Sequence, residues 1–305
     1  KDDNNSRRNF LRKGLLAGAA AIAGSAFISS CSGEPESGEK IKVLTTDGKI
    51  VEVDKAHVKS EKQVREEARQ GIPGRKFVMV IDLAKCANAR KCTEVCQEGH
   101  QLPKSIEYIR VYLLQDSEKT APYWFPRPCF HCDNPLCVSV CPVGATYKRS
   151  DGIVLVDQER CIGCKFCMTG CPYSARSFAW EHHENYETPM QYDPETTAPG
   201  KEGTVSKCVF CADRVAENKL PYCVEACPMG VIYFGDVDED TVTNGAETVL
   251  FSQLIKDRGG YRYLENLGTR PSVYYLPPVN RQFDIERGFK GLDEDVKERY
   301  KDTDY

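Results

Sequence analysis

The chain has 305 residues, of which 41% are hydrophobic, so it can bury one large core or two small ones. Its net charge is −4 with acidic and basic residues interspersed, which excludes the basic footprint that nucleic-acid binding requires. Of its sixteen cysteines, fifteen fall in four dense groups between Cys86 and Cys227, so they must be metal ligands or disulfides.

The N-terminus predicts an exported protein. Arg7 and Arg8 precede an apolar stretch, residues 15–28, that is rich in Ala and Gly and resembles a twin-arginine export signal. This stretch is shorter than the roughly 20 residues that span a bilayer. Because twin-arginine export carries folded proteins, a cofactor can be inserted in the reducing cytoplasm, which favours metal clusters over disulfides. We therefore expect a location at the periplasmic face of the cytoplasmic membrane.

Cys31 stands apart from the four cysteine groups. The stretch Ile28-Ser29-Ser30-Cys31 resembles a lipoprotein processing site, which makes Cys31 the candidate for a lipid anchor. The alternative is a stray cysteine in a flexible leader. Residues 1–30 are accordingly predicted to be a signal or an uncleaved anchor.

Residues 31–75 are predicted to hold a linker and a β-hairpin. Residues 32–40 are polar and rich in Gly, Glu and Ser, as is typical of linkers. The next segment, "IKVLTTDGKIVEVD", alternates apolar and polar residues around Asp47-Gly48, which predicts a hairpin. Residues 55–70 are charged and predict a surface helix or loop.

From residue 76 the sequence repeats itself, which indicates two copies of one unit. "IDLAKC", ending at Cys86, matches "VDQERC", ending at Cys161, and "CPVGATY" at Cys141 matches "CPMGVIY" at Cys227. One copy, residues 129–181, holds the second and third cysteine groups. The other copy is split by the first and holds groups one and four, in residues 76–128 plus 205–236.

The remaining segments predict a loop and an extension. Residues 182–204 have the Pro, Thr and Glu content of a long surface loop inserted between groups three and four. Residues 237–305 contain no cysteine and are predicted to be a C-terminal extension that packs around the core or contacts a partner. Within it we expect an amphipathic segment near residues 250–255 and an extended stretch, "LGTRPSVYYLPP".

The third cysteine group carries the strongest chemical signal. Cys161, Cys164, Cys167 and Cys171, followed by Pro172, fit C-x2-C-x2-C-x3-C-P without a deviation. In two-cluster ferredoxins the first three cysteines of such a run bind one cluster and the fourth reaches the other. Groups two and four follow the same plan with a longer gap before the third cysteine.

This cross-over rule sorts the cysteines into sets. Three sets of four thiolates each predict [4Fe–4S] clusters, with iron held by these residues: set one is Cys161, Cys164, Cys167 and Cys141; set two is Cys129, Cys132, Cys137 and Cys171; set three is Cys208, Cys211, Cys223 and Cys96.

Set four lacks one ligand. Aligning the two repeats puts Ala89 where Cys164 stands in the other copy, so only Cys86, Cys92 and Cys227 remain. Three thiolates favour a [3Fe–4S] cluster, in which the corner facing Ala89 has no iron. The alternatives are a [4Fe–4S] cluster with water or another side chain on one iron, and an empty site.

Other readings of the cysteines fit less well. Zinc sites also use C-x2-C pairs, but not three cysteines at this spacing followed by a fourth and Pro. A disulfide scaffold would need an even number of clustered cysteines. Near the ligands, we expect His131 to hydrogen bond around a cluster or merely to pack there, and Trp124 and Trp180 to shield the clusters from water. No nucleotide-binding, haem-attachment or nucleophile motif marks a substrate site.

The cysteine pattern, "KCVFCADR" at residues 207–214 and the "LGTRPSVYYLPP" stretch together resemble a known family. These are the four-cluster iron–sulfur subunits of membrane oxidoreductases for polysulfide, tetrathionate and dimethyl sulfoxide, of formate-dependent nitrite reduction, and of the sulfite-reduction-linked complex. The resemblance covers residues 76–280 and implies an α+β fold with two nested ferredoxin-like β-α-β units. Its departures are Ala89, and Gln97 where the other groups have Pro.

The resemblance also implies a function. The chain is expected to relay electrons between an integral-membrane, quinone-reactive subunit of the polysulfide-reductase type and a catalytic molybdopterin or multihaem cytochrome subunit, with no turnover of its own. One alternative is a free-standing periplasmic polyferredoxin. Another is an enzyme that uses the cluster of set four as a Lewis acid.

Overall fold

The computed structural model describes five stretches of the chain, which are residues 40–44, 50–54, 61–117, 120–181 and 192–279. Its contacts divide the chain into two compact units, residues 1–59 and 60–305, which are described separately. Several predicted features lie outside the described residues: the export signal at 1–30, Cys31, part of the loop insertion at 182–191 and the tail at 280–305.

The first unit contains one antiparallel pair of strands, β1 (Lys40–Leu44) and β2 (Ile50–Asp54). Lys40 pairs with Asp54, and Leu44 pairs with Ile50. The pair occupies the stretch whose alternation of apolar and polar residues predicts a hairpin.

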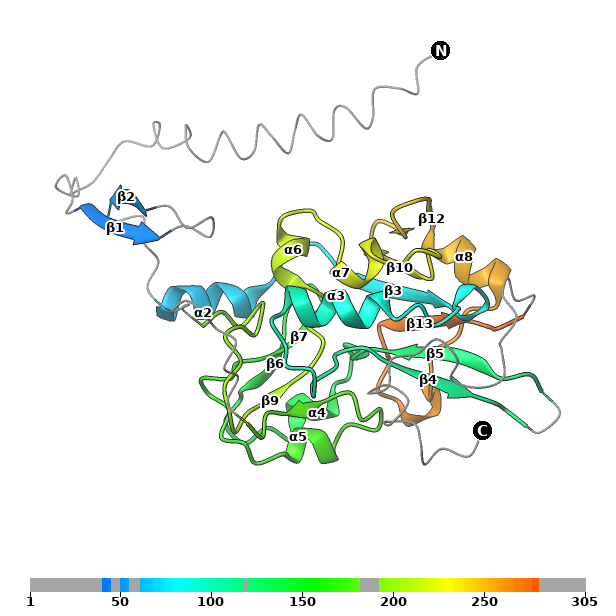
Figure 1. Cartoon of the computed structure of the whole chain (residues 1–305), viewed down its shortest axis with the longest axis horizontal. Coiled ribbons are helices and arrows are strands. Elements are labelled where there is room, and N and C mark those ends of the chain that lie inside the picture. The colour runs from blue at the N-terminus through cyan, green and yellow to red at the C-terminus, as the bar shows by residue number, and fades with distance from the viewer. Residues whose placement is uncertain (1–39, 45–49, 55–60, 118–119, 182–191, 280–305) are drawn as a thin grey trace, which may run out of the picture. The chain divides into compact units, whose positions relative to one another are not determined.

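The second unit is built on a five-stranded sheet with the order β12-β11-β10-β3-β13 (Figure 1). Its central strand, β3, pairs antiparallel with β10 and parallel with β13. Every residue of β3 is buried, because Met79 and Ile81 face the main core while Val78 and Val80 face a smaller core beneath α8. A continuous apolar run is typical of a strand covered on both faces. The elements are β3 (Phe77–Asp82), β10 (Ile232–Asp236), β11 (Thr241–Thr243), β12 (Thr248–Leu250), α8 (Phe251–Arg258) and β13 (Val273–Leu276).

A smaller pair of strands repeats the plan of β3 and β10. Strand β7 ends before Cys161 as β3 ends before Cys86, and β6 follows Cys141 as β10 follows Cys227. Both pairs are antiparallel, and short helices accompany them, with α3 packed on α7 and α4 packed on α5. The elements are α3 (Lys91–Gly99), α4 (Leu136–Ser139), β6 (Thr146–Lys148), β7 (Val154–Val156), α5 (Phe166–Thr169) and α7 (Tyr222–Glu225).

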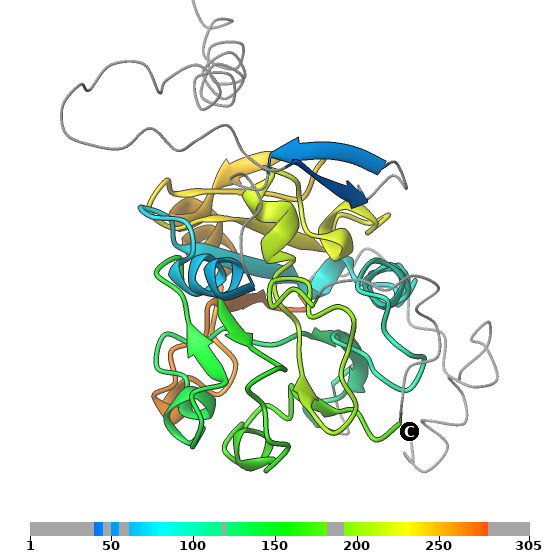
Figure 2. The ribbon, with the colours of Figure 1, turned by 90° about the vertical axis from the view of Figure 1, so that its left-hand side faces the viewer.

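Two views show how these parts lie within the second unit. In Figures 1 and 2 the green segment with β6, β7, α4 and α5 occupies one side, and the yellow segment with α6 (Ala212–Ala216), α7 and β10 occupies the other. Strand β3, from the earlier cyan segment, lies between them next to β13. Cysteine groups that are far apart in sequence therefore lie side by side, as clusters with shared ligand sets require.

Further hairpins and helices complete the unit. The β4–β5 and β8–β9 pairs, both antiparallel, were not anticipated from the sequence pattern. The remaining elements are α2 (Glu61–Gln70), η2 (Leu83–Lys85), β4 (Arg110–Leu114), β5 (Tyr123–Arg127), β8 (Ser177–Phe178), β9 (Val205–Ser206), α6 (Ala212–Ala216) and η3 (Glu265–Leu267). Small sheets with short helices make the fold α+β, as predicted.

Residues beyond 236 contribute to this core. Strands β11, β12 and β13 join the main sheet, and helix α8 lies in the region where the sequence predicts an amphipathic segment. The stretch before β13 runs along the second cysteine group: the Ser272 N–H donates to the Phe130 carbonyl at 2.9 Å, and the Asn134 N–H donates to the Thr269 carbonyl at 3.0 Å.

Candidate iron–sulfur centres

The fifteen cysteines within the described residues are all free thiols. A zinc ion would need its thiolate ligands about 2.3 Å from one point. Across the same residues, no three His, Cys, Asp or Glu side chains converge closely enough to hold a single metal ion. A polynuclear core, in which each thiolate binds a different iron, does not need such convergence.

The three thiols of set four lie together. Cys86, Cys92 and Cys227 line one cavity, and Ala89 lines it with them. Burial raises the pKa of Cys86 to about 12 and that of Cys92 to about 11, and the neighbouring Cys227 thiol adds to both shifts. The Val231 N–H donates to the Cys227 sulfur at 3.4 Å. Ala89 brings no donor atom to this cavity.

The four thiols of set three, Cys96, Cys208, Cys211 and Cys223, are all buried. Burial raises the pKa of Cys208 to about 11, and it raises the pKa values of Cys96 and Cys223 well above their usual range. The thiols of Cys208 and Cys211 add to the last two shifts. His100 contributes a polar contact, with its Nε2 3.3 Å from the Cys211 sulfur.

Set two brings Cys171, from the third group, to the cysteines of the second group. Burial raises the pKa of Cys132 to about 12, and the thiols of Cys129, Cys137 and Cys171 add to the shift. Burial also raises the pKa of Cys171, with Cys129 contributing. These mutual effects place the four sulfurs near one another.

Set one is the most accessible. Burial raises the pKa of Cys167, and the Cys161 thiol adds to that shift. Cys141 follows α4, which packs on α5. Burial would raise its pKa, but backbone N–H donors, including that of Thr146 at 3.5 Å, outweigh burial and lower it. Cys164 is the one exposed cysteine among the described residues.

A shared backbone feature marks all four groups. The residue two positions after the first cysteine is left-handed in each, namely Asn88 (φ 58°), His131 (φ 41°), Gly163 (φ 70°) and Phe210 (φ 54°). Left-handed residues in such turns point successive N–H groups into a concavity that favours anions. Glycine is the residue that ordinarily indicates this conformation, and only Gly163 is a glycine. The left-handed conformation at the other three positions could therefore not be predicted from the sequence.

The loop around Ala89 keeps the geometry of the complete loop around Cys164. The following residues, Arg90 (φ 55°) and Lys165 (φ 62°), are both left-handed, and they precede α3 and α5 directly. Ala89 thus occupies the backbone position of Cys164. The missing ligand in set four reflects a side chain and not a refolded loop.

Gln97, which stands where the other three cysteine groups have Pro, has a structural consequence. Helix α3 continues past Cys96 to Gly99, whereas α5 ends at Thr169, before Cys171 and Pro172. Proline lacks an N–H and disfavours a helical residue before it, so the Cys-Pro step stops a helix. Gln97 permits the extra turn, and its side-chain amide donates to the Ile106 carbonyl at 3.0 Å.

His131 connects two cysteine groups. Its ring stacks on Phe210 of the fourth group with centroids 3.7 Å apart, and its Nδ1 accepts a hydrogen bond from the Val154 N–H at 3.0 Å. His131 lies between Cys129 and Cys132 in the sequence, and Phe210 lies between the first two cysteines of the fourth group. The side chain therefore packs at the junction of sets two and three, as well as bonding to the backbone.

Two buried cationic side chains indicate that the cysteine sets suit a negatively charged group. Lys207 is 1% exposed and its Nζ donates to the carbonyls of Val154 and Cys208, the latter at 2.8 Å. Arg176 is 4% exposed and its Nη1 donates to Thr146 Oγ1 at 3.3 Å. Within the described stretches neither has a carboxylate partner. A buried unpaired charge costs several kcal/mol, so both positions call for a nearby negative charge. Thiolate-ligated iron–sulfur clusters supply that charge, and the residues fit them.

Some functional candidates escaped the sequence pattern, and one prediction about side chains is wrong. Arg176 and His100 follow no motif, and Lys207 is visible only as the first residue of "KCVFCADR". Trp180 is 71% exposed, so it does not shield the clusters from water. It lies instead at the surface, where its ring contacts Phe178 and sits under the Lys165 ammonium, 3.6 Å from the ring centre.

Comparison with known proteins gives a consistent result. Residues 120–198 and 192–237 match the family model of the 4Fe-4S dicluster domain. The B component of selenate reductase from Mesobacillus selenatarsenatis is 37% identical over 295 residues, which cover 90% of this chain and 97% of the relative.

Two further relatives are similar in their cysteine-rich part. The B component of tetrathionate reductase from Salmonella typhimurium is 36% identical over 216 residues, covering 69% of this chain and 76% of the relative. The iron-sulfur cluster-binding subunit of menaquinone reductase from Nitratidesulfovibrio vulgaris is 36% identical over 232 residues, covering 66% and 88%. Among the described residues, no helix has the length and apolar character needed to cross a membrane.

Proposed function

Because the chain belongs to the family of iron–sulfur subunits of reductase complexes, we propose that it conducts electrons between two partner subunits and performs no substrate chemistry itself. Homologues in this family are electron-transfer subunits, and the sequence carries no motif for a substrate site. Conduction needs redox centres that follow one another at short range in a dry interior. The order of the thiol sets supports such an arrangement.

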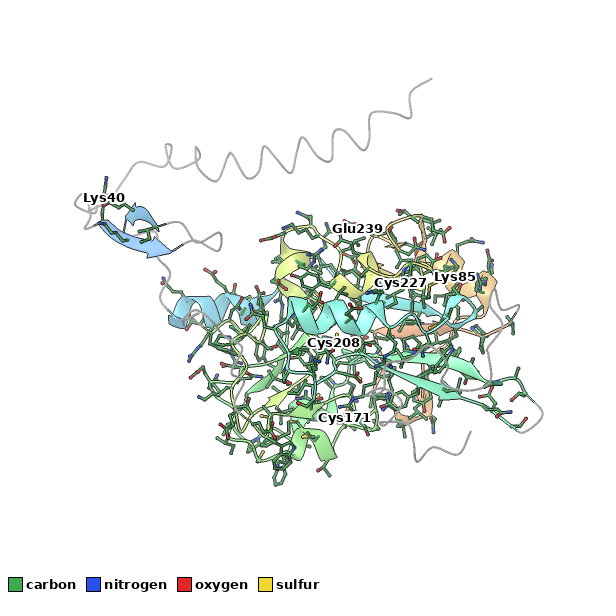
Figure 3. All side chains as sticks on the ribbon, in the orientation of Figure 1. Lys40, Lys85, Cys171, Cys208, Cys227 and Glu239 are labelled. Carbon is green, nitrogen blue, oxygen red and sulfur yellow. The ribbon has the colours of Figure 1, made fainter. Side chains whose placement is uncertain are left out.

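The observation that carries this proposal is the electrostatic interaction between thiols of neighbouring sets. Burial is the larger cause of the raised thiol pKa values, but thiols of neighbouring sets add to them at three junctions. Cys92 raises the pKa of Cys96, Cys129 raises that of Cys208, and Cys137 raises that of Cys167. These interactions support a row in the order four, three, two, one. Figure 3 labels one cysteine from each of sets four, three and two, and Cys227, Cys208 and Cys171 follow one another from the β10 side toward the α5 side.

We assign [4Fe–4S] clusters to sets one, two and three and a [3Fe–4S] cluster to set four. Ala89 in the cavity of Cys86, Cys92 and Cys227 supports the second assignment, because three sulfurs meet there without a fourth. When bound, the clusters supply one-electron redox chemistry. The matching strand pairs β3–β10 and β6–β7 support two nested ferredoxin-like units, residues 76–128 plus 205–236 and residues 129–181.

One end of the row suits a partner. Around exposed Cys164 the surface presents three large apolar side chains, Ile162 at 63% exposure, Phe166 at 60% and Trp180 at 71%. Exposed apolar groups near a redox centre favour a docking surface. We propose that the two ends serve a quinone-reactive membrane subunit of the polysulfide-reductase type and a catalytic molybdopterin or multihaem cytochrome subunit. The relative named a menaquinone reductase supports the quinone side.

The proposed location is the periplasmic face of the cytoplasmic membrane. Its support is the sequence alone: the paired Arg7 and Arg8, the apolar stretch after them, and the processing pattern at Cys31. Fractionation of cells that express this gene without its partner subunits tests it, with the unmodified protein expected in the membrane fraction and the Cys31→Ala variant in the soluble periplasmic fraction.

The function is tested on the complex purified from membranes. Adding menaquinol should reduce the clusters of this chain, seen by low-temperature electron paramagnetic resonance, and a menaquinol-site inhibitor should prevent it. Mass spectrometry should find a membrane subunit in the same complex. If the chain purifies as a cluster-loaded monomer from its native host and no membrane subunit accompanies it, the relay proposal is wrong and a free polyferredoxin is favoured.

A further inference from the structure

Arg176 is a buried cation whose surroundings differ from those of other buried charges. Only 4% of it is exposed, Nη1 donates to Thr146 Oγ1 at 3.3 Å, and Nη2 has no hydrogen-bond partner within the described residues. Arg149 is equally buried, at 3%, but its guanidinium pairs with Asp151 at 2.7 Å and with Glu195. Arg149 is therefore neutralised by carboxylates, and Arg176 is not.

The neighbours of Arg176 are thiols from two different sets. Thr146, to which Arg176 donates, gives its own N–H to the Cys141 sulfur of set one at 3.5 Å. The guanidinium charge acts on the thiols of Cys137, of set two, and Cys167, of set one. Cys129, also of set two, lies near enough to interact electrostatically. The side chain thus sits at the junction of sets one and two. A guanidinium keeps its charge throughout the accessible pH range, because its pKa lies far above that range.

We propose that Arg176 is a redox-tuning residue, whose permanent positive charge between sets one and two stabilises the reduced forms of both clusters and raises both reduction potentials. This inference rests on the proposed function, since it needs clusters at these two sets. Reduction adds one negative charge to a cluster. A fixed cation in a low-dielectric interior favours that added charge more strongly than it would in water. Because one cation lies near both sets, it shifts both potentials in the same direction and changes the difference between them little.

The test compares three variants of the purified complex by potentiometric titration, with electron paramagnetic resonance as the readout. In Arg176→Gln, the equilibrium constant for one-electron reduction should fall about tenfold at clusters one and two, which is about 59 mV for each. Clusters three and four should keep their potentials. Arg176→Lys keeps the charge and should shift clusters one and two by less than half as much.

Arg110→Gln is the matched control. Arg110 donates to the carbonyl of Ser174 and to the hydroxyl of Ser177, on the chain segment that carries Arg176, but it is partly exposed to solvent. Because solvent screens this charge, its removal should change the equilibrium constant for one-electron reduction of each cluster by less than threefold. Unchanged potentials at clusters one and two in Arg176→Gln, with all iron present, overturn the inference, as does an equal shift at all four clusters.

A second measurement uses the unmodified complex and does not depend on whether a variant folds. With ¹⁵N-labelled arginine, pulsed paramagnetic resonance of the reduced protein should detect guanidinium nitrogen couplings at two of the four clusters. Couplings at none, or at one alone, contradict the inference. A complex that contains no iron in sets one and two instead refutes the proposed function, so the two failures are distinguishable.

Discussion

The loop from Cys86 to Cys96 and the loop from Cys161 to Cys171 have the same length and share left-handed turns at matching positions, yet they differ in one ligand and in the residue that follows the last cysteine. Ala89 replaces Cys164, and the residue after the last cysteine is Gln97 instead of Pro172. The first change removes a cysteine without moving the loop, and the second permits a longer helix, because α3 continues past the last cysteine to Gly99 whereas α5 ends at Thr169. The number of cysteine ligands and the helix length thus vary independently on one backbone plan.

The largest effect is expected from removing a thiol that both loops share. Cys92→Ala leaves set four with two thiolates, too few to hold a cluster, so the purified protein should lose about three irons while the other clusters stay. Iron analysis with paramagnetic resonance measures this. Cys31→Ala, which removes a cysteine that belongs to no set, is the matched control and should keep its full iron content. A Cys92→Ala protein with unchanged iron would remove this residue from the ligand set.

Exchanging Ala89 and Cys164, the residues that distinguish the two loops, should change the iron content by one iron per chain, upward in one variant and downward in the other. Ala89→Cys supplies the fourth thiolate, so total iron should rise from about fifteen to about sixteen per chain, and the signal of an oxidised three-iron centre should disappear. Cys164→Ala should do the reverse at set one. Sixteen irons in the unmodified protein, or no gain in Ala89→Cys, would contradict the three-iron assignment.

Gln97→Pro tests why the helices differ in length. Proline within α3 removes a backbone donor and clashes with the preceding turn, which should destabilise the protein by about 3 kcal/mol and lower the melting temperature by about 6–12 °C. Circular dichroism at a fixed heating rate measures it. Gln97→Ala loses the side-chain bonds to the Ile106 and Lys104 carbonyls but keeps the helix, so its loss should be about 1 kcal/mol. Equal losses in both variants would show that only the side chain matters.

The smallest effect concerns the left-handed turns. Asn88→Gly copies Gly163, relieves the left-handed strain, and removes a buried carbonyl oxygen that has no partner within the described residues. The greater freedom of unfolded glycine offsets part of this, so we expect a gain of about 0.5 kcal/mol, or about 1–2 °C in melting temperature.

The reverse exchange sharpens the comparison. In Gly163→Asn the new Cβ would lie 2.3 Å from the Gly203 carbonyl oxygen, so this variant should be clearly less stable. If Asn88→Gly lowers the melting temperature while Gly163→Asn leaves it unchanged, the two turns are not equivalent.

The cysteine sets could be predicted from sequence because cluster binding restricts local spacing tightly, as at Cys161 to Cys171. The repeats around β3 and β7 were visible for the same reason: each strand leads directly into its cysteine group. The assignment of individual clusters to those sets stays a prediction.

What sequence could not supply depends on tertiary packing. Arg176 has no motif around it, and its significance arises only where two sets meet. The left-handed turns at His131 and Phe210 are imposed on residues that do not ordinarily signal them. Trp180 was expected to shield the clusters because tryptophan is usually well buried, but the local packing leaves it on the surface.

Anomalous scattering at the iron edge, recorded from crystals of the purified complex, tests the central claim most directly. The account predicts four iron sites in a row, in the order four, three, two, one, with three irons beside Cys86, Cys92 and Cys227 and four in each of the others. Isolated zinc ions, disulfides in place of the clusters, or iron sites in a different order would contradict it.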